Sequence, residues 1–109
     1  MKKFLVIYHA PQSVVEQMAQ ATPEQRAESM KPWMEWKEAL GDKMLDLGAP
    51  LFGGQKLNPN GSVAPSQKEV TGYSMIQAGD MEEAKSLLEG HPHLAAGGCE
   101  IEVHEAMAM

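Results

Sequence analysis

The segment Lys3–His9 most constrains the fold, because it is apolar on both of its alternating faces. Its two sets of side chains are Phe4, Val6 and Tyr8 on one side, and Leu5 and Ile7 on the other. Successive side chains of a strand point to opposite faces, so the run predicts a strand buried on both sides. A chain of 109 residues forms one domain with a single two-layer core. Such a strand therefore needs more cover than one layer of helices supplies.

Helices are expected on either side of residue 30. Two helix-start patterns, Ser13 with Glu16 and Thr22 with Gln25, predict one or two short helices within residues 13–29. The main helix is expected to begin near Pro32 and to end before Gly48, because large apolar residues recur there at spacings of three and four. These residues are Trp33, Trp36, Leu40, Met44 and Leu47.

Three further strands are expected after the main helix. The runs "PLFGGQKL" at 50–57, "TGYSMIQA" at 71–78 and "CEIEVHEAM" at 99–107 carry strand-forming residues, and 63–70 reads as a loop. Asp80 and Glu83 predict the start of a second helix, and Gly90 its end.

The resulting order, β-α-β-β-α-β, predicts an α+β, ferredoxin-like domain with a four-stranded antiparallel sheet and helices on one face. Because the first strand is apolar on both faces, the uncovered side of the sheet is expected to pack on a second copy as a dimeric α/β barrel. A monomer whose long loops fold over the sheet is the alternative.

Composition narrows the class of protein. Nine Lys and Arg residues against fifteen Asp and Glu residues give a net charge of −6, with no basic stripe, which argues against a nucleic-acid surface. No apolar run approaches the roughly 20 residues that span a bilayer, so no membrane association is expected. The single cysteine, Cys99, makes no internal disulfide and fits a cytoplasmic protein.

Several segments together resemble the YCII-related, or DGPF-domain, family. They are the strand ending in "YH", "TPEQ", "WMEWKEALGDKMLDLGAPLFGG", "GYSMIQAGDMEEAKSLLEGHPHL" and "GGCEIEVHEAM". The resemblance covers residues 1–109 as a single domain. It implies a ferredoxin-like α+β protein that pairs as a dimeric barrel, and it says more about the fold than about an activity.

The chain departs from the family pattern at the positions that would carry chemistry. One branch has a His-Asp pair, and here Met34 stands in place of the histidine and His91, before Pro92, in place of the aspartate. The Asp-Gly-Pro-Phe signature of the other branch is also missing. A thioether carries no proton near neutral pH, so that pair's acid-base chemistry is not expected here.

Candidate site residues come from several elements. His9, at the end of the first strand, is the one candidate base, although a hydrogen-bonded strand-end histidine is the simpler interpretation. Glu100, Glu102 and His104 share one face of the last strand, as a site or as a solvated edge. Five residues are candidates for lining a ligand cavity, or simply for the core: Tyr8, Trp33, Met34, Trp36 and His91.

The stretch "GHPHLAAGGCE" at 90–100 contains metal-ligand types but no metal-site spacing. Pro92 favours an extended His91, which tends to turn the side chains of His91 and His93 apart. We therefore expect no metal, and a connection into the last strand that leaves His91 near a cavity mouth. Phosphate-binding loops and dinucleotide fingerprints are absent from the sequence, so no cofactor is expected.

These observations predict a homodimer that binds a small organic molecule without a clear catalytic apparatus. A cofactor-independent lyase or isomerase with a histidine base in the barrel is the alternative, and a purely structural partner of another protein is a third. The sequence does not decide whether the chain is an enzyme.

Overall fold

Four antiparallel strands form the central sheet of the computed structural model, which describes residues 1–65, 70–95 and 97–108. The strands are β1 (Lys2–His9), β2 (Met44–Asp46), β5 (Val70–Ala78) and β6 (Glu100–Ala106), in the order β2-β5-β1-β6. The helices are α1 (Gln12–Ala19), α2 (Pro23–Leu40) and α3 (Met81–Leu87), with short 3₁₀ turns η1 (Gly41–Lys43) and η2 (Pro92–Ala95).

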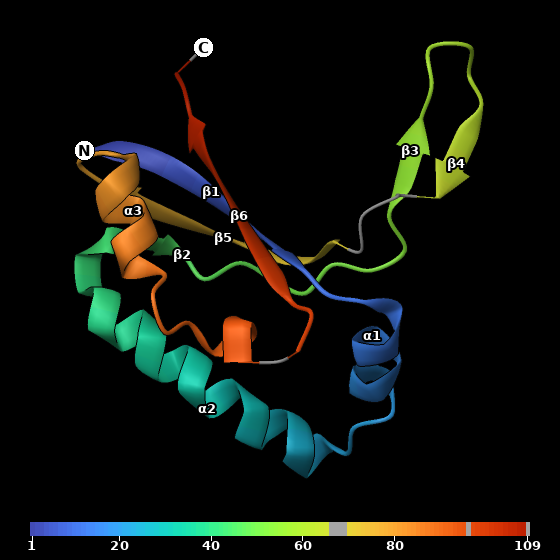
Figure 1. Cartoon of the computed structure of the whole chain (residues 1–109), viewed down its shortest axis with the longest axis horizontal. Coiled ribbons are helices and arrows are strands. Elements are labelled where there is room, and N and C mark those ends of the chain that lie inside the picture. Colours follow the sequence, from blue (N-terminus) through green and yellow to red (C-terminus); the bar gives the residue numbers. More distant parts are fainter. Residues whose placement is uncertain (66–69, 96, 109) are drawn as a thin grey trace.

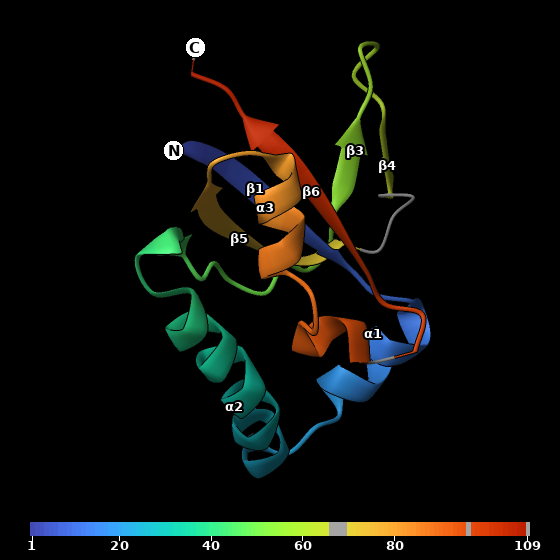
Figure 2. The same cartoon turned by 60° about the vertical axis from the view of Figure 1, so that its left-hand side comes forward.

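The arrangement confirms the predicted ferredoxin-like fold. The first and last strands lie side by side, and the two middle strands of the sheet are β5 and β1. Both α2 and α3 lie on the same side of the sheet, and α1 lies at one end of it (Figure 1, Figure 2). Two right-handed crossovers around a sheet produce this topology.

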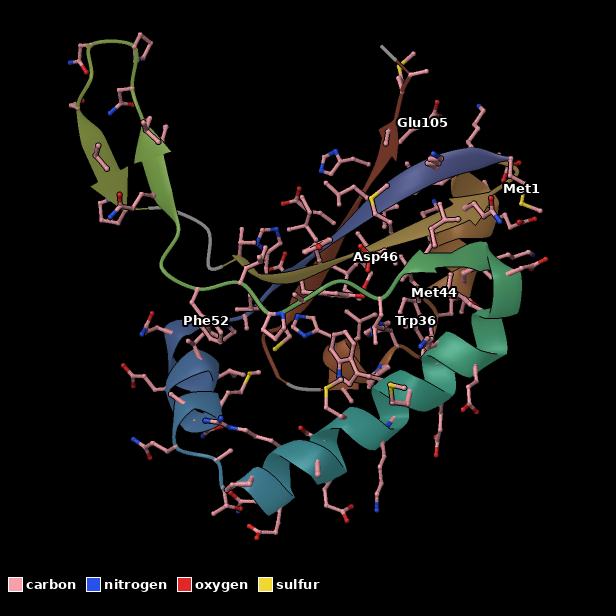
Figure 3. The ribbon with its side chains drawn as sticks, turned by 180° about the vertical axis from the view of Figure 1, so that it is seen from behind. Met1, Trp36, Met44, Asp46, Phe52 and Glu105 are labelled. Atoms are coloured by element: carbon pink, nitrogen blue, oxygen red, sulfur yellow. The ribbon has the colours of Figure 1, made fainter. Side chains whose placement is uncertain are left out.

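The two faces of the sheet differ in how they are covered. On the helix side, Phe4, Val6 and Ile76 are fully buried and form the centre of the core. Trp36 projects from α2 toward this core (Figure 3). On the other side, hereafter the open face, Leu5 lies opposite Met75 and Ile7 opposite Tyr73. These four apolar side chains are only half-buried, so β1 is apolar on both faces as predicted, but only one face has a helical cover.

The long helix begins earlier and ends earlier than the sequence pattern predicted. It starts at Pro23 and ends at Leu40, and Pro32 lies inside it rather than at its beginning. A capping box decides the start: Thr22 Oγ1 accepts from the Gln25 amide at 3.1 Å, and the Thr22 amide donates to Gln25 Oε1 at 2.9 Å. Pro32 is tolerated on an exposed position, where its missing N–H frees one carbonyl toward water.

The second strand of the sheet was also wrongly placed. It is Met44–Asp46, directly after the helix, and not 50–57. From the predicted strand only β3 (Gln55–Leu57) forms, and it pairs with β4 (Val63–Pro65) in a separate hairpin. Residues 63–65 of the expected loop are thus a strand, and residues 66–69 of it lie outside the described part of the chain.

Residues 47–51 run close beside β5, and this approach requires a glycine at position 48. Gly48 has φ +85°, and a Cβ atom there would lie 1.7 Å from the Tyr73 carbonyl oxygen. Only glycine fits this position without moving the backbone.

Within the described ranges, no helix is long and apolar enough to cross a bilayer.

Candidate functional site

A buried chain of hydrogen bonds links the predicted residue His91 to the core strands. His91 is 1% exposed, and its Nδ1 accepts the His93 backbone N–H at 3.0 Å. Its Nε2 lies 3.4 Å from Tyr8 Oη, which lies 2.7 Å from Ser74 Oγ. Ser74 Oγ in turn lies 2.6 Å from the Leu47 carbonyl oxygen. Residues from β1, β5, η2 and the segment after β2 are thereby joined.

The direction of this chain follows from its two ends. The Leu47 carbonyl oxygen only accepts, so the Ser74 hydroxyl donates to it, and the Tyr8 hydroxyl must donate to Ser74 Oγ. At the other end Nδ1 of His91 accepts from a backbone N–H, which leaves the ring hydrogen on Nε2. His91 Nε2–H therefore donates to Tyr8 Oη. This series of hydrogen bonds requires a neutral His91, because Nδ1 of a protonated ring would carry a hydrogen and could not accept from the His93 amide.

Aromatic rings enclose the imidazole of His91. The ring centroid of Trp36 lies 4.4 Å from it and that of Trp33 lies 4.5 Å from it, both edge-on. The indole of Trp36 also donates to the Leu87 carbonyl oxygen at 2.9 Å. Burial, together with a smaller effect of the neighbouring His93, lowers the pKa of His91 to about 4. Burial raises the pKa of Tyr8 to about 12, although its hydrogen bond to Ser74 opposes this.

The structure therefore brings four of the five expected cavity residues together, but as a filled part of the core. Tyr8, Trp36 and His91 are buried, and Trp33 packs against Tyr8 at a ring distance of 4.8 Å. His91 lies inside the core and not at the expected cavity mouth. Met34 lies on the outer side of α2 and is 40% exposed. A neutral histidine and a protonated tyrosine in this packing are suited to hold the fold, not to transfer protons near pH 7.

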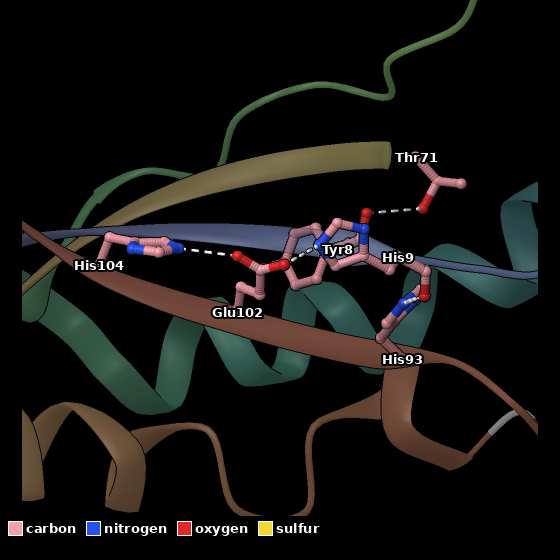
Figure 4. Close-up of polar contacts among 6 residues, drawn as sticks. All are labelled: Tyr8, His9, Thr71, His93, Glu102 and His104. Atoms are coloured by element: carbon pink, nitrogen blue, oxygen red, sulfur yellow. Dashed lines mark hydrogen bonds and ion pairs between the residues drawn. The ribbon is translucent and has the colours of Figure 1, made fainter. Parts of the chain in front are cut away.

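A second polar group lies on the open face of the sheet (Figure 4). Glu102 Oε1 lies 2.8 Å from His9 Nε2, and Glu102 Oε2 lies 2.8 Å from His104 Nε2. We call these three residues the His-Glu-His array. The His9–Glu102 contact is an ion pair only when His9 is protonated, and neither ring nitrogen of His9 meets hydrogen-bond geometry with a described residue. The side chain of His9 is 14% exposed and that of His104 is 60% exposed, so the array runs from a sheltered end to solvent.

Side chains of His93 and Thr71 hold the backbone at the end of β1. The His9 carbonyl oxygen accepts from His93 Nε2 at 2.8 Å, and the preceding carbonyl, of Tyr8, accepts from the Thr71 hydroxyl at 3.3 Å. His91 and His93 have different hydrogen-bond partners, Tyr8 Oη and the His9 carbonyl oxygen, although the ring centroids of both lie 5.2 Å from that of Tyr8. The array can orient a polar ligand and accept or release a proton.

The sequence reasoning missed Ser74 and the structural part played by His93. Ser74 is the one hydroxyl among the inward-facing residues of β5, which otherwise are Gly72, Ile76 and Ala78. A polar residue in an apolar inward row is the signal that was available.

An open groove lies on the helix side, beside the edge strand β6. Its volume is about 340 Å³, and it is lined by Met81, Lys85, Leu88, Glu89, Leu94, Ile101 and Val103. None of the site residues predicted from the sequence lines this groove. Across the described residues, no three His, Cys, Asp or Glu side chains converge as metal ligands would.

The stability of the fold should depend on the charge of His91. The pKa of His91 falls from 6.5 in the unfolded chain to about 4 in the folded one, so only the unfolded chain gains a proton between these values. The contribution of His91 to the unfolding free energy is therefore complete above pH 6.5 and is lost as the pH falls toward 4. Between about pH 7.5 and about pH 5, the wild type should lose about 2 kcal/mol more unfolding free energy than His91→Asn.

Urea unfolding at the two pH values measures this difference. In His91→Asn the amide oxygen can still accept from the His93 amide but does not titrate. The variant therefore measures the pH dependence that all other groups contribute, and the wild type is compared with it. Equal losses in the two proteins would show that His91 is not held neutral.

Comparisons with known proteins agree with this fold. A family model described as the YCII-related domain matches residues 1–106. No functionally curated protein matches the chain. Among solved structures, 5-chloro-2-hydroxyhydroquinone dehydrochlorinase (TftG) from Burkholderia phenoliruptrix AC1100, in complex with 2,5-dihydroxybenzoquinone, is similar with a TM-score of 0.55 and 18% sequence identity. The similarity covers 96% of this chain and 93% of that one, and at this identity it concerns the fold. The family match spans nearly the whole sequence, and the chain belongs to the YCII-related family.

Proposed function

We propose that the protein is a cytoplasmic homodimer that binds a small, planar organic molecule between the open faces of two sheets. The observation that carries the proposal is the open face itself, where half-buried apolar side chains adjoin the His-Glu-His array. Apolar patches of this kind on a small protein mark interaction or ligand sites.

Pairing of two open faces supplies the cover that the helices do not. Leu5 with Met75 and Ile7 with Tyr73 form two adjacent cross-strand pairs, which give a continuous apolar strip across β1 and β5. A two-fold axis through such a strip matches each residue with apolar neighbours from the other copy. Two sheets packed in this way lie about 10 Å apart and leave room for side chains or a flat ligand between them.

The ligand is placed on the open face because the aromatic residues expected to line a cavity on the helix side pack against one another, and the groove on that side holds none of them. These residues are Tyr8, Trp33, Trp36 and His91. The array at the edge of the open face offers a carboxylate and two imidazoles, which favours a ligand with hydroxyl or carbonyl groups. The ligand bound to the structurally similar dehydrochlorinase, 2,5-dihydroxybenzoquinone, has this character and is a suitable probe.

Binding and dimerisation should be lost together. In Ile7→Asp a carboxylate enters the apolar strip, so the variant should sediment as a monomer and should show no thermal shift with 2,5-dihydroxybenzoquinone. The wild type should sediment as a dimer and melt several degrees higher with the quinone at about 100 times its Kd.

Met18→Asp is the matched control, because Met18 is an apolar residue 53% exposed on α1, far from the strip in sequence and on another element. It should behave as the wild type. A monomeric wild type, or a quinone shift that survives in monomeric Ile7→Asp, contradicts the proposal.

Proton transfer is a second candidate function, and the His9–Glu102 contact favours it. A carboxylate beside an imidazole stabilises the charge that the ring gains when it takes a proton. In a dehydrochlorination of a chlorinated hydroquinone, His9 would take a hydroxyl proton and return it to the ring carbon that bears chlorine. Chloride then leaves with the bonding electrons of the carbon–chlorine bond while a second hydroxyl proton passes to His9, so that HCl is lost overall and a quinone is formed. Such a reaction needs no cofactor and uses only groups of the array.

This candidate predicts chloride release from 5-chloro-2-hydroxyhydroquinone that depends on His9. His9→Gln should lower kcat by about 10²-fold or more, because it removes the base, while the thermal shift with the quinone persists. His104→Gln, at the solvent-exposed end of the array, is the control and should keep most of the activity. Wild-type protein that binds the quinone but releases no chloride above the buffer rate leaves binding as the function and excludes this reaction.

A further inference from the structure

The β3–β4 hairpin stands apart from the rest of the domain. It projects from the side of the sheet opposite α2 in each view (Figure 1, Figure 2, Figure 3). Among the described elements, its strands pack extensively only against each other. Two strands of three residues are not stable in isolation as a free ribbon, so an exposed hairpin of this size calls for a contact that holds it.

The two faces of the hairpin differ in character. Leu57 lies directly opposite Val63, so both side chains are on one face, and they are 77% and 54% exposed. Lys56 lies opposite Ala64, on the other face. Phe52, although 78% exposed, precedes the hairpin and points away from it, toward the side where α1 lies (Figure 3).

The turn of the hairpin is tightly ordered by its own polar groups. The Asn58 amide donates to the Ser62 carbonyl oxygen at 2.9 Å, and the Gly61 amide to the Asn58 carbonyl oxygen at 2.9 Å. Asn60 Oδ1 accepts from the Ser62 amide at 2.9 Å. The turn is thus preorganised, which lowers the entropy lost when the two short strands that carry the apolar pair dock on a partner.

We propose that the hairpin is a dimerisation arm whose Leu57–Val63 face docks on a second copy of the chain. The inference rests on the homodimer proposed above and adds a second contact region to it. Each arm would extend past the edge of its own open face and pack on the other protomer, so that two symmetric arms embrace the paired sheets.

Three observations favour a second copy as the occupant. The arm and the open face lie on the same side of the sheet, so one body that covers the open face also meets the arm (Figure 1, Figure 2). Both surfaces are apolar. Lys56 is the single charged residue among residues 50–65, in a chain in which 22% of residues are charged, and depletion of charge is typical of the centre of a protein interface.

Sedimentation equilibrium from about 0.1 to 100 µM tests the arm. The double variant with Leu57→Ser and Val63→Ser should raise the dimer Kd at least tenfold, because two apolar side chains per protomer are no longer buried. The matched control, Lys56→Ser with Ala64→Ser, changes the opposite face of the same strands and should leave Kd within about twofold. Replacement of residues 55–65 by a short Gly-Ser linker repeats the test should the double variant fail to fold.

The outcomes separate the arm from the homodimer. A double variant, or a linker variant, that dimerises as the wild type does while Ile7→Asp is monomeric overturns the arm and leaves the homodimer. A control variant weakened as much as the double variant also overturns it, since the contact would then not belong to the Leu57–Val63 face. A wild type that is monomeric at every concentration overturns both proposals.

Discussion

The hydrogen-bond chain through His91 is the constraint on which the rest of this structure depends. It joins β1, β5, η2 and the Leu47 carbonyl oxygen inside the core, at the place where the helix layer meets the sheet. Each donor has one acceptor, so loss of one group would leave another buried and unpaired, at a cost of about 1–3 kcal/mol. The neutral imidazole, held between two indoles, lets a polar residue replace apolar packing without an unsatisfied atom.

The two sides of the sheet therefore differ in what their polar and aromatic residues do. On the helix side, the residues that could have lined a cavity hold the layers together. On the open face, the apolar strip and the His-Glu-His array remain available to a partner and a ligand. Membership of the YCII-related family concerns the fold, and function has to be argued from the site itself. Met34 and His91, the two residues that the family resemblance led us to compare with an acid-base pair, lie in different surroundings, since Met34 is 40% exposed and His91 is 1% exposed.

The sequence predicted the fold well because hydrophobic alternation and capping are local signals. The alternation in Lys3–His9 and 71–78 identified the two central strands, and Asp80 identified the start of α3. The sequence-based prediction was wrong where two local signals competed. Pro32 is typical of a first turn, yet the capping box at Thr22 starts the helix nine residues earlier at Pro23, and Met44–Asp46 leaves the helical pattern to pair with β5. The site could be predicted only as a list of residues, because whether His91 faces a cavity or Tyr8 depends on side chains 83 positions apart in sequence.

The protonation state of His91 is the property that tests this account most directly. Side-chain ¹⁵N NMR, with His91→Asn used to assign the ring, reports which nitrogen carries the hydrogen at about pH 5.5, where a histidine of ordinary pKa is mostly protonated. The account predicts a neutral ring with its hydrogen on Nε2, since burial holds the pKa of His91 near 4. A doubly protonated ring at that pH, or a neutral ring with its hydrogen on Nδ1, would contradict it.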